Sequence, residues 1–224
     1  MHAVAPVRSH FDSGGKAISL DGFVPEGDAR RFPAVIGLHG SGGSYASLTE
    51  PAAHLAAQGF AVYIPHYFER TGTSEITDKE SMVRHFPLWG KALWDAVGHV
   101  AGQGQVDPGK IGLVGFSLGA YLALSVASVD PRIQAVVDFF GGFPKEMKFF
   151  MRRLCPTLIL HGEADPTVPV EEAHHLQQML ENRGIPYEMH IYPGVGHRFD
   201  GETCRDAGQR TLAFLRKYLT NRGR

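Results

Sequence analysis

The chain has 224 residues, of which 43% are hydrophobic, enough for a substantial core in one or two domains. Its formal net charge is −1, so no overall field draws it to nucleic acid or to an anionic membrane. Two cysteines without metal-ligand spacing, Cys155 and Cys204, and the lack of an apolar secretory run in residues 1–15 predict a cytoplasmic protein with reduced thiols.

Short apolar runs alternate with longer segments of helical periodicity along the chain, a pattern typical of parallel β–α–β units. Strands buried on both faces are continuously apolar, as most of these runs are. The predicted strands are residues 33–38, 60–64, 110–115, 133–139, 157–160 and 187–192, and residues 5–24 before them suggest a hairpin near Gly14 and Gly15. We expect a single domain over residues 1–224, with a mostly parallel, twisted sheet flanked by helices on both faces.

Four segments have the features of helices. Apolar residues from Met82 to Val100 recur at helical spacing, and because Pro87 interrupts them we expect that helix to begin at Pro87. The other predicted helices are residues 120–127, a stripe from Ala173 to Leu180, and residues 206–219. The uncharged stretch 111–129 approaches the length of a membrane span, but its glycines and serines divide it into a strand, a turn and a helix. We therefore expect no membrane segment.

The strongest local motif is Gly115-Phe116-Ser117-Leu118-Gly119, which follows a predicted strand and opens a predicted helix. In this context a strained turn can lift a serine hydroxyl above the edge of a sheet, an arrangement called a nucleophile elbow. The alternative is a glycine-rich junction between strand and helix with an incidental serine. We favour the first interpretation, which makes Ser117 the candidate nucleophile.

A serine hydroxyl needs a base to take its proton and an acid to orient that base. In a fold with this elbow the order along the chain is serine, acid, histidine. Asp165, in the loop after the strand at 157–160, is the favoured acid, and Asp138, at the end of the preceding strand, is the competing one. His197, in the glycine-containing loop after the last predicted strand, is the candidate base.

A fourth element is the glycine-rich sequence His39-Gly40-Ser41-Gly42-Gly43, directly after the predicted strand at 33–38. Glycines let backbone N–H groups point at a developing oxyanion, so the amides of Ser41 and Leu118 are the candidate donors of an oxyanion hole. The loop lacks the lysine of a Walker motif, and no G-x-G-x-x-G opens the first β–α turn. We therefore expect no nucleotide and no cofactor.

Together these elements give the chain a resemblance to the dienelactone hydrolase family of the α/β-hydrolase fold. The resemblance extends from residue 18 to 219 and rests on HGSGG at 39–43, YIPHYFER at 63–70, GFSLG at 115–119, HGEADPTVP at 161–169 and GVGHRF at 194–199. It implies a nucleophile at Ser117, an acid at Asp165 and a base at His197. The best-known members carry Cys at the position of Ser117 and, at the position of Gly40, a glutamate that handles the proton of the thiol. The two differences are consistent with each other, because a serine hydroxyl activated by histidine needs no such glutamate.

The same resemblance implies a substrate-binding role for Arg70, because family members bind a substrate carboxylate with two arginines. We expect its neighbours Tyr67 and Phe68 to contact substrate as well. The position of the second arginine has no arginine here, although Arg198 lies close to it in sequence. The alternative for Arg70 is a surface arginine paired with Glu69 or Glu75.

The segment between the predicted strands at 133–139 and 157–160 is too short for a helical cap domain. We expect its large apolar residues to form a small wall of the pocket or to pack against the core; they are Phe143, Met147, Phe149, Phe150 and Met151. An open site of this kind suits small esters or lactones.

We therefore predict a cofactor-free serine hydrolase that cleaves small carboxylic esters or lactones through an acyl-enzyme intermediate. An acyl-thioesterase or peptidase with the same three residues is the second candidate, and a non-catalytic binding protein on this fold is the third. A metal site is not expected, because Glu171 with His174 or His175 lacks a third ligand. The expected partner is a small-molecule substrate, with neither nucleic acid nor membrane bound, and the sequence gives no indication of the oligomeric state.

Overall fold

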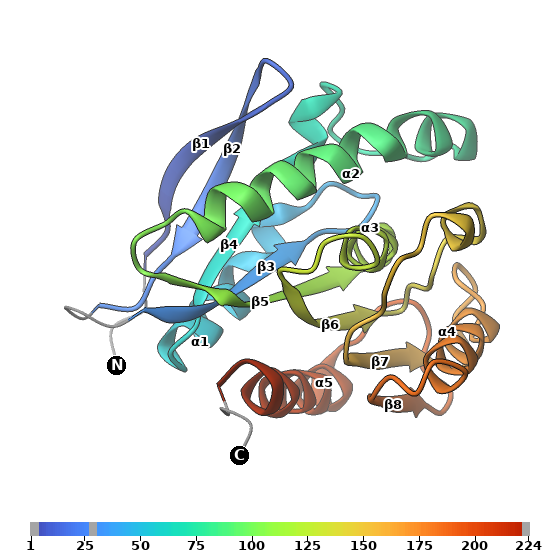
Figure 1. Cartoon of the computed structure of the whole chain (residues 1–224). Coiled ribbons are helices and arrows are strands. Elements are labelled where there is room, and N and C mark those ends of the chain that lie inside the picture. Colours follow the sequence, from blue (N-terminus) through green and yellow to red (C-terminus); the bar gives the residue numbers. More distant parts are fainter. Residues whose placement is uncertain (1–4, 27–30, 221–224) are drawn as a thin grey trace.

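The computed structural model describes residues 5–26 and 31–220, and at its centre is one eight-stranded sheet (Figure 1). The strands lie in the order β1-β2-β4-β3-β5-β6-β7-β8. Strands β3 to β8 pair in parallel with one another, whereas β2 is antiparallel to both β1 and β4. Their bounds are β1 Val7–Ser13, β2 Lys16–Phe23, β3 Phe32–Leu38, β4 Ala61–Pro65, β5 Val106–Phe116, β6 Ile133–Phe139, β7 Thr157–Gly162 and β8 Tyr187–Tyr192. All six apolar runs predicted as strands are confirmed.

Helices cover both faces of this sheet (Figure 1). Helices α2 (Lys79–Ala101), α3 (Leu118–Ala127) and α4 (Glu171–Glu181) pack on one face, and α1 (Thr49–Ala57) and α5 (Gly201–Leu215) pack on the other. Each face has its own apolar core, because successive strand residues point to opposite sides: Leu113 of β5 belongs to one core and Val114 to the other. The predicted fold class, a mostly parallel sheet between two helical layers, is confirmed.

The predicted N-terminal hairpin is also confirmed. Strands β1 and β2 pair antiparallel from Val7 with Gly22 to Ser13 with Lys16. The turn between them consists of two glycines whose φ angles are 60° and 79°. Residues with a side chain rarely adopt such values, which explains the Gly-Gly pair. The hairpin extends the sheet beyond β4.

Helices α2 and α5 begin five or more residues before their predicted starts. Helix α2 starts at Lys79 rather than at Pro87, because the Asp78 carboxylate caps it by accepting a 2.8 Å hydrogen bond from a backbone amide of the first turn. Pro87 therefore lies inside the helix, where it removes one backbone hydrogen bond. Helix α5 starts at Gly201 rather than at Asp206. The prediction missed its first turn because that turn is largely exposed and lacks the apolar stripe on which the prediction rested.

The connection between β6 and β7, residues 140–156, contains one short helical turn at Lys145–Phe149 and no inserted domain. The expectation that a cap domain is absent is confirmed. Of its apolar residues, Phe143 is buried and the two methionines pack against the core, as expected. Phe149 and Phe150 are exposed instead, which corrects their expected place in a pocket wall or in the core. The turn directs its other apolar side chains inward and leaves these two without a surface to cover.

Within residues 5–26 and 31–220, no helix combines the length and the apolar character that a membrane crossing requires. Cys155 is buried, Cys204 is exposed, and both are free thiols, as predicted. Residues 1–4, part of the segment without a secretory run, lie outside the described residues.

Candidate active site

Ser117 lies in the sharp turn between β5 and α3, at the carboxyl edge of the sheet. Its φ is 53° and its ψ is −117°, a conformation that costs free energy for any residue with a side chain. The glycines of the motif are required by packing. A Cβ on Gly115 would collide with the backbone of Gly119 and of the residue after it, and a Cβ on Gly119 would collide with the carbonyl of His39. The sequence thus builds the turn that presents the serine hydroxyl.

Ser117, His197 and Asp165 form a continuous hydrogen-bonded chain. The Oγ of Ser117 lies 3.0 Å from Nε2 of His197, and Nδ1 of His197 lies 2.7 Å from Oδ2 of Asp165. The other oxygen of Asp165 accepts hydrogen bonds from the backbone amides of Thr167 and Val168, at 2.8 and 2.9 Å. In this geometry the imidazole can accept the serine proton while the carboxylate fixes the orientation of the ring.

The surroundings of Asp165 favour its ionised form. Burial by itself raises the pKa of this carboxyl group, but the hydrogen bonds from His197 and from the two backbone amides outweigh burial and hold the pKa below its usual value. The competing acid, Asp138, lies on β6 with its side chain wholly buried, and neither of its oxygens has a hydrogen-bond partner in the described part of the chain. Burial raises the pKa of Asp138 to about 7. Of the two acids, only Asp165 is hydrogen-bonded to His197.

The glycine-rich loop after β3 lies against the turn that carries Ser117. A Cβ on Gly40 would stand 3.3 Å from the carbonyl oxygen of Phe116 and 3.4 Å from the Cβ of Ser117. Ser41 lines the same cleft as Ser117. Within the described residues, the amides of Ser41 and Leu118 donate to no backbone carbonyl. Both N–H groups therefore stay available beside the serine.

Tyr67 and Phe68, which we expected to contact substrate, lie behind this loop instead of lining the cleft. Tyr67 is wholly buried, and its hydroxyl donates a 2.7 Å hydrogen bond to the carbonyl of His39. Burial raises the pKa of Tyr67 well above its usual value, so the hydroxyl keeps the proton that it donates. Phe68 is also buried and meets the His39 imidazole edge-on. The structure corrects the expectation: both side chains support the loop.

Arg70, expected to bind a substrate carboxylate, does not line the cleft either. Its guanidinium lies at the turn of the N-terminal hairpin, where a Cβ on Gly14 would stand 2.7 Å from Arg70 Nη2. Glu69, one of the two expected alternative partners of Arg70, accepts a 2.7 Å hydrogen bond from the backbone amide of Ser19 instead, and within the described residues Glu75 forms no ion pair with Arg70. The side chain of Arg70 therefore packs against the hairpin, which corrects its assignment to substrate binding.

A cleft of about 500 Å³ opens beside Ser117 and His197. Its apolar walls were not predicted, because phenylalanines at strand ends resemble core residues in a sequence; they are Phe116, Phe139, Phe140 and Phe199. Phe140 packs against the His197 imidazole with 4.8 Å between ring centroids. Arg198 is the one permanently charged side chain that lines the cleft within the described residues. The cleft thus offers an apolar chamber with a cation at its edge.

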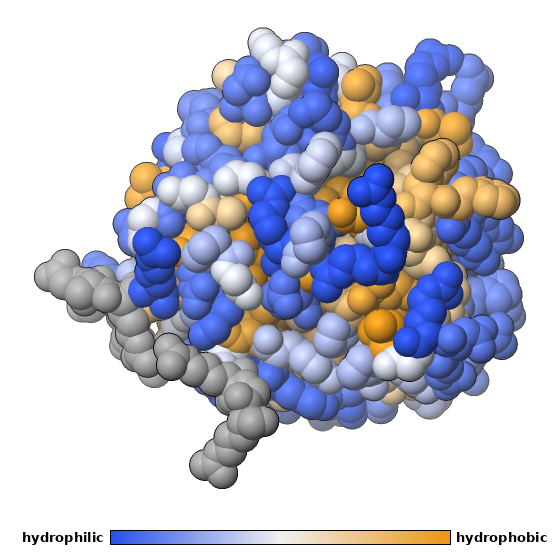
Figure 2. All heavy atoms as spheres, in the orientation of Figure 1, coloured by the Kyte–Doolittle hydropathy of each residue, from blue (hydrophilic) through white to orange (hydrophobic). Residues whose placement is uncertain are grey.

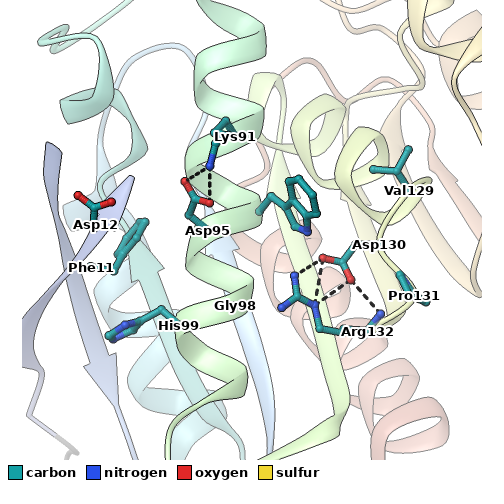
Figure 3. Close-up of a pocket in the computed structure, with 11 residues that line it drawn as sticks. Phe11, Asp12, Lys91, Asp95, Gly98, His99, Val129, Asp130, Pro131 and Arg132 are labelled. Atoms are coloured by element: carbon teal, nitrogen blue, oxygen red, sulfur yellow. Dashed lines mark hydrogen bonds and ion pairs between the residues drawn. The ribbon is translucent and has the colours of Figure 1, made fainter. Parts of the chain in front are cut away.

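A second hollow, of about 800 Å³, lies along α2 between β1 and the connection from α3 to β6 (Figure 3). Two ion pairs join four of its charged groups: Lys91 lies 2.7 Å from Asp95, and Arg132 lies 2.6 Å from Asp130. The residues that line it include no serine, threonine or cysteine. This hollow therefore offers no hydroxyl or thiol nucleophile. In the described part of the chain, no cluster of three or more His, Cys, Asp or Glu side chains could hold a metal ion.

The chain is similar to several proteins of known type. The model of the dienelactone hydrolase family matches residues 20–218. A carboxymethylenebutenolidase of Pseudomonas putida is 28% identical over 172 residues, 70% of this chain and 70% of that protein. Acyl-protein thioesterase 1 of Gibberella zeae is 27% identical over 154 residues, 63% of this chain and 64% of that protein. A solved structure, a dienelactone hydrolase-like promiscuous phosphotriesterase from metagenomic libraries, superposes with a TM-score of 0.82 at 17% identity over 97% of this chain and 99% of that one, which shows the fold.

Proposed function

The chain belongs to the dienelactone hydrolase family, and we propose that it is a serine hydrolase that cleaves small carboxylic esters or lactones through an acyl-enzyme intermediate. The observation that carries this proposal is the hydrogen-bonded chain from Ser117 through His197 to Asp165. Ser117 is the proposed nucleophile, His197 the general base and Asp165 the acid that orients the base. The serine elbow and the adjoining glycine-rich loop support the same assignment.

In the proposed first step, Nε2 of His197 takes the hydroxyl proton of Ser117 while Oγ attacks the carbonyl carbon of the substrate. The carbonyl oxygen becomes an oxyanion, for which the amides of Ser41 and Leu118 are the proposed donors. The carboxylate of Asp165 stabilises the imidazolium that forms. As the tetrahedral intermediate collapses, His197 gives its proton to the leaving oxygen and the acyl group stays on Ser117. In a lactone, the leaving hydroxyl remains attached to the acyl group.

In the second step, water is the nucleophile and Ser117 is the leaving group. A water molecule takes the place of the leaving alcohol, and His197 accepts one of its protons as the water oxygen attacks the acyl carbon. A second oxyanion forms in the same position. Its collapse breaks the bond to Ser117, which regains its proton from His197 and is released together with the free acid.

The size and lining of the cleft support a small substrate. A volume of about 500 Å³ between phenylalanine side chains accommodates an acyl group of modest size, and no cap domain covers it in the described residues. Arg198 at the same cleft supplies a positive charge, which favours a substrate that carries a carboxylate of its own.

An acyl-thioesterase is the second candidate, favoured by the similarity to an acyl-protein thioesterase, since a thioester passes through the same acyl-enzyme. A peptidase would use the same residues but must expel an amine. The third candidate, a non-catalytic binding protein, requires the serine to be unreactive.

One screen separates these candidates. The purified protein and Ser117→Ala are compared on p-nitrophenyl esters, lactones, acyl-thioesters and short peptides, beside labelling with a fluorophosphonate. We expect oxygen esters or lactones to be cleaved fastest, with labelling that depends on Ser117. Faster thioester or peptide cleavage would favour the second candidate, and an unlabelled, folded protein would favour the third.

Two further parts of the proposal concern the whole chain. We propose a cytoplasmic location, supported by two free thiols. We also propose that residues 1–224 form a single domain, supported by the one sheet that all eight strands share.

A further inference from the structure

The connection between β6 and β7 carries two adjacent aromatic side chains that no part of the described chain covers. Phe149 is 93% exposed, more than any other large hydrophobic side chain of the described residues, and Phe150 is 67% exposed. Hydrophobic side chains protrude at the upper right of Figure 2, where Figure 1 places this turn. Neither residue lines the cleft beside Ser117, so the proposed reaction does not account for them.

The exposure is built into the structure of the turn. Phe143 before it and Leu154 after it are both buried, and Met147 packs against the core between them. Arg153 ties the end of the turn to the protein, because its Nη1 donates hydrogen bonds of 3.0 and 2.7 Å to the backbone carbonyls of Asp130 and Ile133. The segment is therefore held along its length, and the two phenylalanines are presented outward.

Positive charges surround the aromatic pair. Lys145, Lys148 and Arg152 are exposed, and none of them forms an ion pair within the described residues. Glu146 is the one acidic residue from 140 to 154. The local excess of positive charge contrasts with the whole chain, whose formal net charge is −1.

The exposed phenylalanines and the cations around them together indicate what kind of surface could cover Phe149 and Phe150. A symmetric contact between two copies of the chain, centred on Phe149, would place the cations of both copies close together, which opposes association. A surface that is anionic outside and apolar inside satisfies the cations and the phenylalanines at once. An anionic lipid bilayer has this chemistry.

We propose that residues 144–152, here called the docking turn, bind the surface of an anionic lipid bilayer. Phe149 and Phe150 insert at the level of the headgroups, while Lys145, Lys148 and Arg152 bind the anionic headgroups around them. The site is peripheral and needs no membrane-spanning helix. It replaces the expectation of no membrane partner, which rested on the net charge of the whole chain and on the absence of a spanning segment.

Flotation with lipid vesicles tests this proposal. The full chain is mixed with vesicles of phosphatidylcholine and phosphatidylglycerol in equal parts, or of phosphatidylcholine alone, at low and at high salt. We expect binding to the anionic vesicles at low salt and weaker binding at high salt, because salt screens the headgroup charges. The double substitution Phe149→Ala with Phe150→Ala is expected to lower the partition coefficient at least ~10-fold, since two aromatic side chains no longer enter the interface.

Matched variants separate the docking turn from general effects. Lys145→Gln with Lys148→Gln is expected to weaken binding to the anionic vesicles. Lys16→Gln with Arg183→Gln removes the same charge elsewhere on the surface, and Val7→Ala removes another exposed apolar side chain, 73% exposed on β1 at the other end of the sheet. Neither control is expected to change binding. Circular dichroism melts confirm that each variant is folded, whatever its enzymatic activity.

Two results would overturn the proposal. One is wild-type protein that does not float with the anionic vesicles, or that floats equally well after both phenylalanines are replaced. The other is a dimer in size-exclusion chromatography that Phe149→Ala with Phe150→Ala dissociates, because that result assigns the docking turn to a second copy of the chain.

Discussion

Tyr67 and His39 are joined in two ways. The hydroxyl of Tyr67 donates a 2.7 Å hydrogen bond to the carbonyl of His39, and the two rings stack with 4.3 Å between their centroids and 11° between their planes. His39 is the first residue of the loop that contains Ser41, while Tyr67 is buried behind that loop. The position of the proposed oxyanion donor therefore depends on a side chain that does not itself line the cleft.

Tyr67→Phe removes this hydrogen bond and keeps the stacked ring. A neutral hydrogen bond contributes about 1 kcal/mol, so we expect kcat to fall ~5-fold if the loop loses its alignment with the oxyanion. KM should change little, because Tyr67 does not line the cleft. Steady-state kinetics on a p-nitrophenyl ester measure both constants, and Tyr63→Phe, at a buried tyrosine of β4, is the control. A lower Tm with unchanged kcat would assign Tyr67 to stability alone.

Ser117→Ala removes the proposed nucleophile. We expect kcat to fall at least ~10⁴-fold, the scale for a serine acting with a histidine, and fluorophosphonate labelling to disappear. Ser47→Ala, at another serine of the same cleft, should leave both unchanged. Near-native turnover by Ser117→Ala would remove this residue from the mechanism.

The choice between the two acids is tested by amide substitutions. Asp165→Asn is expected to lower kcat by ~10⁴-fold, because an amide can hold the imidazole of His197 in the wrong tautomer. Asp138→Asn should leave kcat within a few fold, since Asp138 makes no hydrogen bond to His197. The two variants are compared by ester hydrolysis at one pH. The opposite ranking would make Asp138 the acid.

Asp138 should also make the stability of the fold depend on pH. Its pKa is about 7 in the folded chain, above the value of about 4 for an unfolded carboxyl group. Below about pH 4 both states hold the proton, whereas between about pH 4 and 7 only the unfolded state ionises, so stability falls as pH rises and levels off above about pH 7.

Asp138→Asn abolishes this titration. We expect the Tm of the variant, relative to wild type, to rise from pH 4 to pH 7 and then to stay constant, as calorimetry at a series of pH values would show. The offset at pH 4 reflects the buried amide itself, so the change with pH is the diagnostic quantity. A difference in Tm that is the same at every pH would contradict the elevated pKa.

Arg198 and Arg70 make a matched pair for substrate recognition. Arg198 lines the cleft, whereas Arg70 packs against the N-terminal hairpin. Arg198→Gln is therefore expected to lower kcat/KM about 10-fold for an ester or lactone that carries a carboxylate, and to leave a neutral p-nitrophenyl ester unaffected. Arg70→Gln should not distinguish the two substrates. Equal losses on both substrates after Arg198→Gln would indicate a role other than charge recognition.

The elements of the fold could be predicted where local sequence decides them. Parallel strands buried on both faces are apolar throughout, so each apolar run predicted a strand. The close packing that requires glycine at 115 and 119 is a property of the G-x-S-x-G turn, so the motif itself predicted it. The order of Ser117, an acid and His197 along the chain followed from the same motif.

Side-chain directions in loops could not be predicted, because distant contacts decide them. Arg70 lies in a short turn at Tyr67–Arg70, and its orientation depends on the hairpin at Gly14, far away in sequence. The interruption of the apolar pattern at Pro87 suggested a helix start, but the cap at Asp78 begins the helix earlier. Packing of the helix on the sheet compensates for the backbone hydrogen bond that Pro87 removes. The outward position of Phe149 likewise depends on which of its neighbours reach the core.

The backbone conformation of Ser117 lowers the stability of the folded chain. Glycine adopts a φ of 53° and a ψ of −117° without steric strain. Replacing the serine by glycine would therefore relieve backbone strain of order 1–3 kcal/mol while removing the hydroxyl. The strained turn and the hydroxyl therefore belong together: the substitution that relaxes this backbone also leaves the proposed reaction without its nucleophile.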